Sequence, residues 1–548
     1  MSVLKNKKVI LLIIMLTQLI CASYVASRKQ EFHIDEMYSY ILSNSYHADK
    51  ISSDDSMWGR WADSDDLTDY ITVQNDERFA FDKVYSNNTT DAHPPLYYWL
   101  LHSVCSFFPG VFSKWSGLGL NLFLYLVTIA VLYQISELIT DDERLAYLPV
   151  ILYGFSPIAL ETLTFIRMYM LITMFAVLLL YVHLRMFSYG YSIKKLLAAW
   201  AIIYLGSMTH YYFIVFSFWC AAVFILQNVK SINRALVAYG TGCLASVALF
   251  IFSYPYVIAQ ATGTSTNNVG NEIRKNLFNW SLWVNESKIL LKNQIDALSY
   301  SNVLSIILAI TAACLTLYVF VYFVLHLRSG QDEQGSELIF GNNYVRRFIQ
   351  WTGIVYVLTF MSITFIGGEY VFLRYIYYIG PSLYIMIAYL ISCYCRIRPG
   401  YTATIVTVIV LFAVSNAVYG VINDSSPYLF RDAYADDIRL SEYDEDPLIV
   451  ISGRNPAVPT GNLTKMRLFD QFYMSDVDSV IDNGIAAECL RNNGECILYI
   501  NTDTYYMDGY DAQKVLDDIQ RSCQTAGVRS EFICNGSLGE FYRITSGL

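Results

Sequence analysis

Apolar runs long enough to cross a membrane recur along most of this 548-residue chain, and they constrain its fold more than any other feature. An α-helix needs ~20 consecutive apolar residues to cross the ~30 Å hydrocarbon core of a bilayer. Hydrophobic residues make up 55% of the chain and charged residues only 15%, which is too apolar for an ordinary soluble protein. The sequence therefore predicts a polytopic, all-α membrane domain.

Lysine and arginine residues orient these runs, because the short cytoplasmic loops of membrane proteins carry an excess of both. Lys5, Lys7 and Lys8 precede the first run. We expect an uncleaved first span with the N-terminus in the cytoplasm, although a cleaved signal peptide has a similar pattern. Eleven crossings, with the C-terminus extracytoplasmic, are expected at 9–26, 94–112, 118–139, 168–187, 195–210, 211–228, 235–256, 300–327, 347–367, 371–393 and 401–422.

One apolar run, residues 145–160, is shorter than the others and contains Pro149 and Pro157. If this run crossed fully, the basic residues in 185–195 would lie outside, against the positive-inside rule. Non-helical backbone is tolerated at membrane depth where protein or water surrounds it. We therefore predict a re-entrant segment that follows the acidic residues 141–143 on the outer side and leaves Glu161, Arg167 and Tyr169 on that side too.

Two outer loops and a polar C-terminal part complete the predicted organisation. The loops are residues 28–93 and 257–299. Both belong to an expected catalytic membrane domain, which is one large helical bundle of residues 1–423. From 424 to 548, short apolar runs alternate with a helical pattern, which predicts a small extracytoplasmic α/β domain. Acidic residues concentrate in the first loop and in this domain, which argues against a nucleic-acid partner.

Four of the 11 cysteines lie in the C-terminal part, at Cys489, Cys496, Cys523 and Cys534. Four cysteines in an extracytoplasmic domain suit two disulfides. Cys489–Cys496 and Cys523–Cys534 form the simplest of three pairings, and free thiols are the alternative.

Ionisable residues gather at the predicted outer ends of the apolar runs. The first outer loop opens with EFHIDEMYSY at 31–40, which places Asp35 and Glu36 beside the membrane surface. A charge at the bilayer centre costs ~2.5–3.5 kcal/mol on insertion scales, so such groups tend to face a protein cavity or the interface. The other members of the set are His93, Glu161, Arg167, His210, Glu369 and Arg374.

Each of these residues also has a purely structural explanation. Arg374 can extend its charge from a span end to the interface, His210 can be a hydrogen-bonded core histidine, and Glu161 can pair with Arg167. What favours a functional site is that acids, histidines and arginines converge on one predicted face of the membrane.

The set contains the groups that transfer from a phosphate-linked donor requires. The arginine fork matches phosphate oxygens, so Arg167 and Arg374 can hold a lipid phosphate. A carboxylate can take the proton of an attacking hydroxyl. A divalent metal has candidate ligands in Asp35, Glu36 and the nearby histidines, but no tight His/Cys spacing is present, and we expect no required cofactor or metal.

Five motifs, in this order, resemble those of the GT-C membrane glycosyltransferases. The resemblance is closest to the branch that contains protein O-mannosyltransferases and the aminoarabinose transferase acting on lipid A, and it covers residues 31–385. The motifs are DEMYSY (35–40), HPPLYYWLLH (93–102), SPIALETLTFIRMYML (156–171), THYYFIVF (209–216) and LRYIYYIGPSLYI (373–385).

The resemblance implies an inverting glycosyltransferase at the outer face of the plasma membrane. Its donor would be a polyprenyl-phosphate-linked sugar, and its acceptor a cell-envelope glycan, lipid or protein. By position, Asp35 would be the catalytic base with Glu36 beside it, and Arg167, Arg374 and Tyr375 would bind the donor phosphate. The residues implied to line the cavity are His93, Glu161, Tyr169, His210 and Tyr211.

The second acid of the family pattern is left open. The family often has a second aspartate near the site, and Glu161 and Asp91 are both candidates. The adjacent pair Asp35 and Glu36 is not expected to act as a glycosidase dyad, since neighbouring residues point in different directions in a helix or a strand.

Two other classes of function also fit a bundle of many spans. A transporter or lipid flippase places ionisable residues near the midplane, often within internal repeats, whereas here they lie at one face and no repeat is visible. A non-catalytic scaffold explains the C-terminal domain but gives the acids and arginines no role. The glycosyltransferase is therefore the favoured hypothesis.

Overall fold

The chain, described in a computed structural model, divides into two compact units, and each is considered by itself. The first comprises Met1–Ser27, Thr89–Tyr97 and Leu118–Pro427, and the second Arg28–Asn88, Tyr98–Gly117 and Tyr428–Leu548. The structure describes residues 7–546 except 47–56, 90, 263–278, 329–336, 338, 368–371, 424–427, 431–432, 453–456, 504–508 and 524–527.

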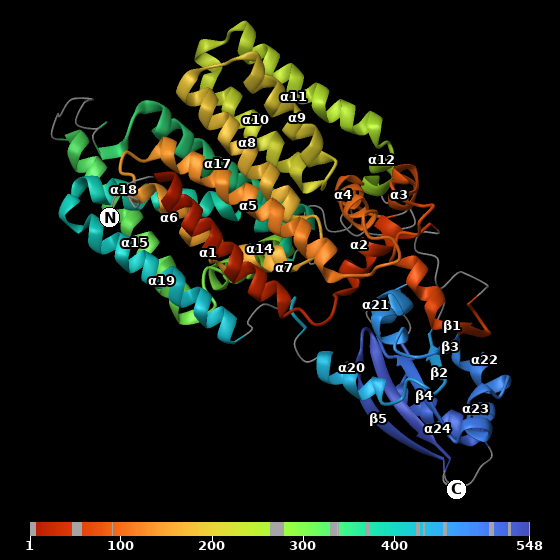
Figure 1. The fold of residues 1–548 in the computed structure, drawn as a ribbon. Coiled ribbons are helices and arrows are strands. Elements are labelled where there is room, and N and C mark those ends of the chain that lie inside the picture. Colours follow the sequence, from red (N-terminus) through yellow and green to blue (C-terminus); the bar gives the residue numbers. More distant parts are fainter. Residues whose placement is uncertain are drawn as a thin grey trace. The chain divides into compact units, whose positions relative to one another are not determined.

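The first unit is a bundle of helices (Figure 1). Its elements are α1 (Lys7–Ser27), α5 (Lys114–Ile139), η4 (Leu145–Tyr147), α6 (Leu148–Gly154), α7 (Pro157–Thr164), α8 (Tyr169–Tyr189), α9 (Ile193–Ser207), α10 (Tyr212–Asn228), η5 (Val229–Ser231), α11 (Arg234–Ser253), α12 (Tyr256–Thr262), α14 (Trp280–Asp296), α15 (Asn302–Arg328), α17 (Asn343–Gly367), η7 (Leu373–Ile379), α18 (Gly380–Ile397), η8 (Pro399–Tyr401) and α19 (Thr402–Ile422).

Nine helical segments in the described part of the chain are long and apolar enough to cross a membrane, and α6 with α7 makes a tenth if the bent pair is one span. They contain α1, α5, α8, α10, α11, α15, α17, α18 and α19. The chain is thus a multi-pass membrane protein, as the sequence predicts. Helix α9, expected to cross at 195–210, has only 15 residues.

The expected crossing at 94–112 is wrong. Helix α4 (Leu96–Cys105) has only 10 residues, and at 1.5 Å per residue it is ~15 Å long, about half the thickness of the hydrocarbon core. Gly110 follows with a positive φ of 72°, a conformation that suits glycine and not a continuing helix. The run is apolar enough for a span, but its helix is too short.

The acidic residues 141–143 lie at the end of the bundle where α1 begins. The Lys7 ammonium contacts the Glu143 carboxylate at 2.9 Å, and the Tyr147 hydroxyl donates to the Lys7 carbonyl oxygen at 3.2 Å. Arg396, which was predicted to be cytoplasmic, pairs with Asp141 at 2.9 Å. Helices α1 and α5 therefore cross in opposite directions, and the prediction that placed the N-terminus and this acidic run on opposite sides of the membrane is wrong.

Helices α6 and α7 together run the length of α5. The Tyr147 ring stacks on Tyr133 near the end of α5, with centroids 5.4 Å apart. Asn121, near the beginning of α5, donates its side-chain amide to the carbonyl oxygens of Leu163 and Phe165, each at 3.0 Å. The pair is therefore a full span bent by 49°, and the predicted re-entrant segment is wrong.

These two errors have one cause. The extra crossing at 94–112 reversed the expected direction of α5, and a hairpin at 145–160 was then needed to restore the charge pattern. With both corrected, α8 starts at the end marked by Asn121 and returns the basic residues in 185–195 to the end where α1 begins, as the positive-inside rule requires.

The second unit contains a six-stranded sheet in the order β1-β3-β2-β4-β6-β5 (Figure 1). Strand β2 is parallel to β3 and β4, and the other pairs are antiparallel. The strands are β1 (Trp61–Asp63), β2 (Leu448–Ile451), β3 (Gln471–Ser475), β4 (Glu495–Asn501), β5 (Arg529–Gly536) and β6 (Gly539–Thr545). The predicted small α/β fold is confirmed, and the first outer loop adds β1 to its edge.

The helices of the second unit come from both of its parts. From the first outer loop come α2 (Ile34–Asn44), η3 (Ser64–Tyr70) and α3 (Phe81–Asn88), and α4 follows. The C-terminal part supplies α20 (Ala433–Ser441), α21 (Ala457–Met466), α22 (Val477–Asp482), α23 (Ile485–Asn493) and α24 (Ala512–Ser522).

Three of the four C-terminal cysteines, Cys489, Cys496 and Cys523, lie in one hydrophobic core with Ile449 and Ile519. Cys489, Cys496 and Cys534 are free thiols in the structure. The two disulfides considered from the sequence are therefore not formed, and these side chains pack as small apolar residues.

Candidate functional site

Polar side chains from four segments of the first unit come together at one end of its helices. The segments are 91–93, 167–169 before α8, 210–212 between α9 and α10, and 374–375 in η7. The His210 ring lies 5.4 Å from the His93 ring, 5.9 Å from Tyr169 and 6.2 Å from Tyr375, measured between centroids. We call these segments the polar cluster.

Asp91 and His93 form an ion-pair geometry within the cluster, with 2.9 Å between the Asp91 Oδ2 and His93 Nδ1 atoms. Gln260 donates to the Asp91 carbonyl oxygen, and Pro94 favours extended backbone at His93. Burial alone would raise the pKa of Asp91, but the charges of His93 and Arg167 lower it to about 2. Asp91 is therefore ionised at neutral pH.

Arg167 stands in the short connection between α7 and α8. Arg167 is 5% exposed, and its positive charge helps to lower the pKa of the Asp91 carboxyl group. Its backbone N–H donates to the Phe165 carbonyl oxygen at 2.8 Å, and the Phe165 ring stacks on Tyr169 at 5.7 Å. The predicted phosphate-binding arginine is therefore buried inside the cluster.

A tight turn between α9 and α10 places His210. A Cβ atom on Gly206 would lie 2.3 Å from the Phe213 ring, so the turn requires glycine there. His210 is 6% exposed, and its Nδ1 accepts a hydrogen bond from the Tyr212 backbone N–H at 3.1 Å. Its neutral ring must therefore carry hydrogen on Nε2, a buried atom with no hydrogen-bond partner among the described residues.

Arg374 lies among aromatic rings and not at a lipid-facing span end. Its guanidinium carbon is 4.6 Å from the Phe372 centroid, 5.5 Å from Phe165 and 5.6 Å from Tyr375. Cation–π contacts of this kind hold a guanidinium against the ring faces. Glu369, which belongs to the same predicted set, lies outside the described residues. The Tyr375 ring in turn lies 5.5 Å from Tyr212.

Two of the predicted lining residues have supporting contacts. Glu161 on α7 accepts a hydrogen bond from the Tyr377 hydroxyl, which follows Tyr375 in η7. The Tyr211 hydroxyl donates to Gln260, the side chain that holds Asp91. Of the two candidates for a second acid, Asp91 is the one that lies against His93 and Arg167.

Asp35 and Glu36 belong to the second unit, where they begin α2. Glu36 is fully buried: it contacts the Lys29 ammonium at 2.8 Å and accepts from the His33 backbone N–H at 2.7 Å. The His33 ring closes a capping box by accepting from the Asp35 backbone N–H. The Asp35 side chain keeps 24% exposure, so it is the member of the pair that solvent can reach.

Sequence reasoning missed several contributors to these arrangements. Lys29, which the sequence analysis did not single out, is the buried partner of Glu36. Gln260, which holds Asp91, lies outside all five motifs. No group of three His, Cys, Asp or Glu residues in the described part of the chain is placed to hold a metal ion.

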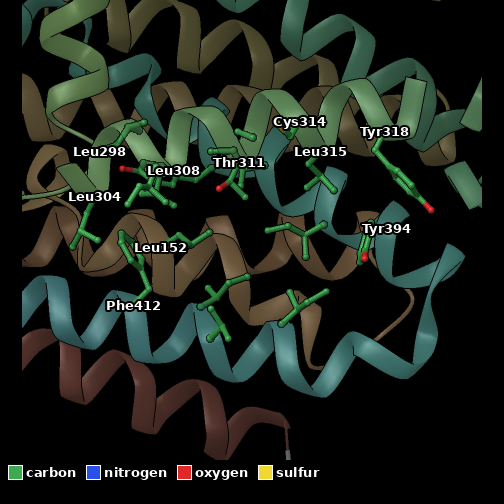
Figure 2. A pocket seen from close by; sticks show the side chains of 18 of the residues that line it. Leu152, Leu298, Leu304, Leu308, Thr311, Cys314, Leu315, Tyr318, Tyr394 and Phe412 are labelled. Atoms are coloured by element: carbon green, nitrogen blue, oxygen red, sulfur yellow. The ribbon is translucent and has the colours of Figure 1, made fainter. Parts of the chain in front are cut away.

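A separate apolar cavity of about 710 Å³ lies between α6, α15, α18 and α19 (Figure 2). Tyr318 and Tyr394 stand at one end of it, and Leu304 and Phe412 near the other (Figure 2). No member of the polar cluster lines this cavity.

Comparisons with known proteins agree with this architecture. Residues 92–256 match the family model of dolichyl-phosphate-mannose-protein mannosyltransferases. The structure of ArnT from Cupriavidus metallidurans bound to undecaprenyl phosphate is similar over 97% of both chains, with 12% identity and a TM-score of 0.51. The archaeal oligosaccharyltransferase AglB from Archaeoglobus fulgidus, with an inhibitory peptide and a dolichol-phosphate, matches 89% of this chain and 69% of its own, with 12% identity and a TM-score of 0.43. No curated protein matches.

Over nearly its whole length the chain therefore has a fold similar to that of ArnT, and residues 92–256 resemble the dolichyl-phosphate-mannose-protein mannosyltransferases. The resemblance predicted from the five motifs is confirmed, since the matched family segment contains His93, Arg167 and His210 and the ArnT fold covers nearly the whole chain.

Proposed function

We propose that the chain is an inverting glycosyltransferase that uses a polyprenyl-phosphate-linked sugar. One observation carries this proposal: Arg167 and His210 lie buried in one cluster with Asp91 and His93, and Arg374 packs on the Phe165 and Tyr375 rings of that cluster. Buried arginine forks and an imidazole donor suit a phosphate. The ArnT structure with undecaprenyl phosphate supports the choice of a lipid phosphate.

In this proposal the polar cluster binds the donor phosphate. Arg167 and Arg374 hold its oxygens, with Tyr375 beside Arg374, and the charge that grows on the phosphate as the sugar leaves strengthens these contacts. Positive groups that are already in place need not reorganise during the reaction. Glu161, Tyr169 and Tyr211 form the surroundings of this site.

Asp35 is our candidate for the base that accepts the proton of the attacking acceptor hydroxyl. Its partial exposure supports this choice, whereas the buried contacts of Glu36 give that residue a structural role in holding α2. Backside attack on the anomeric carbon by the activated hydroxyl inverts its configuration. The membrane catalytic part would be residues 1–423, and no metal is required, so a chelator should leave turnover unchanged.

The charge distribution supports placing the reaction at the outer membrane face. Lys7 and Arg396 mark one end of the bundle, whereas the polar cluster lies at the end where α7 finishes and α8 begins. Because basic residues favour the cytoplasmic side, the cluster faces outward. The N-terminus would then be cytoplasmic and the C-terminus extracytoplasmic, and a cell-envelope glycan, lipid or protein would be the acceptor.

Mass spectrometry of envelope glycans in a deletion strain tests this function and reports the missing sugar with its attachment point. The wild-type gene should restore the modification, and an Asp35→Asn copy expressed at the same level should not. A variant that replaces the exposed Lys514 on α24 serves as the matched control. A deletion strain with an unchanged set of glycans and glycolipids would contradict the proposal.

A further inference from the structure

Two imidazole rings lie side by side in the polar cluster, and a different neighbour sets the tautomer of each. The His93 Nδ1 atom faces the ionised Asp91 carboxylate at 2.9 Å, an acceptor only, so Nδ1 carries hydrogen. His210 accepts at Nδ1 and carries hydrogen on Nε2. The Nε2 atom of His210 is thus always a donor, whereas that of His93 accepts when neutral and donates when protonated.

The two rings also differ in access. The His93 side chain is 18% exposed, whereas His210 is 6% exposed and its Nε2 is enclosed. A ring that solvent and substrate can reach, and that a carboxylate holds in one orientation, is suited to moving a proton. Of the two histidines, only His93 combines both properties.

Charged and titratable groups reach His93 from several elements. Asp91 contacts the His93 ring directly, and the charge of Arg167 acts on the Asp91 carboxylate. The Tyr254 hydroxyl at the end of α11 points at the His93 carbonyl oxygen at 3.5 Å. The surrounding groups in the described segments are Asp91, Arg167, Tyr169, His210, Tyr211 and Tyr254.

We propose that His93, in its imidazolium form, donates its Nε2 proton to the phosphate of the leaving group, with Asp91 as its positioning residue. The inference rests on the proposed function and adds a proton donor to it. The acceptor oxygen forms a bond to the anomeric carbon while the bond from that carbon to the phosphate oxygen breaks. The electron pair of the broken bond stays on the phosphate, which gains a second negative charge.

Protonation of that phosphate is chemically reasonable, because phosphate monoesters take up a proton with a pKa of ~6. The proton from His93 converts the dianionic polyprenyl phosphate to the monoanion, and the proton of the acceptor hydroxyl goes to the base. Neutral His93 then recovers a proton from solvent after the products leave. Atoms and charges balance without any further reactant.

Binding of undecaprenyl phosphate to the full-length chain in lipid nanodiscs, measured from about pH 5 to pH 8, tests this inference. Wild-type affinity should fall from the acidic to the alkaline side, because the proposed contact requires the imidazolium form of His93. In His93→Gln the alkaline fall should shrink to the part that titration of the ligand's own phosphate causes. Affinity at the acidic end should be roughly tenfold to a hundredfold weaker, as expected for one charge-assisted hydrogen bond. An unchanged alkaline fall in His93→Gln would overturn the inference.

Two further variants separate this role from a loss of structure. Asp91→Asn should move the alkaline fall to lower pH, because the imidazolium loses its carboxylate partner. His183→Gln is the control: this buried ring in α8 contacts the Leu179 carbonyl and the Tyr239 hydroxyl, and its loss should leave the pH profile as in wild type. Failure of the wild-type chain to bind undecaprenyl phosphate at any pH would instead overturn the proposed function, and this inference with it.

Discussion

Replacing Lys29 by methionine should loosen the start of α2, the helix that carries Asp35. The Lys29 and Glu36 side chains are both fully buried, and their charged atoms are 2.8 Å apart. Lys29 also donates to the Tyr428 carbonyl oxygen at 2.7 Å. Burial lowers the pKa of Lys29, and the Glu36 charge opposes that shift, so the ammonium depends on its partner.

The expected magnitude follows from this geometry. At 2.8 Å and an effective dielectric constant of about 20, two unit charges attract by roughly 6 kcal/mol. Desolvation offsets most of this, so the intact pair contributes little net stability. Removing one partner leaves the other charge buried and costs about 3–5 kcal/mol, which corresponds to roughly a 100- to 4,000-fold increase in the population of the opened state.

Hydrogen–deuterium exchange of peptides covering Ile34–Asn44 measures this opening directly. Lys29→Met should accelerate exchange by that factor, and the double variant Lys29→Met/Glu36→Gln should recover most of the protection, since glutamine still caps the helix. Replacement of the exposed Lys514 is the matched control. A change of less than tenfold in Lys29→Met, or no recovery in the double variant, would refute the reasoning.

Three other variants test separate parts of the structure. Because the pKa of Asp91 falls from 3.8 to about 2 on folding, its charge stabilises the fold by about 2 kcal/mol above pH 4. Thermal unfolding should show Asp91→Asn less stable than wild type at pH 7, with the difference closing as the pH falls toward 2. A difference in stability that stays constant with pH would contradict this contribution of the Asp91 charge. Arg374→Ala should weaken undecaprenyl phosphate binding by roughly tenfold to a hundredfold, and Arg374→Lys should recover only part, since lysine lacks the fork; equal affinity in all three proteins would exclude this contact. Gly206→Ala should cost about 1–3 kcal/mol in thermal unfolding because its Cβ would overlap the Phe213 ring, whereas Gly119→Ala, which meets nothing within 4 Å, should not destabilise.

Much of the membrane domain can be predicted from the sequence, because a segment that crosses a bilayer must form a long apolar helix. The runs that contain α8, α11 and α17 correspond to predicted crossings. The predicted crossing at 94–112 is wrong because apolar composition does not determine the length of a helix. The helix in this run ends at Cys105. The direction in which α5 crosses is shown by ion pairs between residues far apart in sequence, such as Lys7 with Glu143, and the sequence does not show these pairs.

The polar cluster was predictable in part for a similar reason. Motifs identify chemistry-bearing residues, and His93, Arg167 and His210 lie together as expected. Motifs do not show which side chains bind each other. The pairing of Asp91 with His93, and of Glu36 with Lys29, came only from the folded chain, and these pairings changed the expected roles of both acids.

Release of polyprenyl phosphate from a lipid-linked sugar is the most direct test of the central claim. Purified wild-type chain in nanodiscs, supplied with an envelope lipid extract that contains donors and acceptors, should convert polyprenyl-phosphate-linked sugar to free polyprenyl phosphate, detected by mass spectrometry. Asp35→Asn should release none while it still binds undecaprenyl phosphate. No release by the wild-type chain from extracts of its own host, or equal release by Asp35→Asn, would contradict the account.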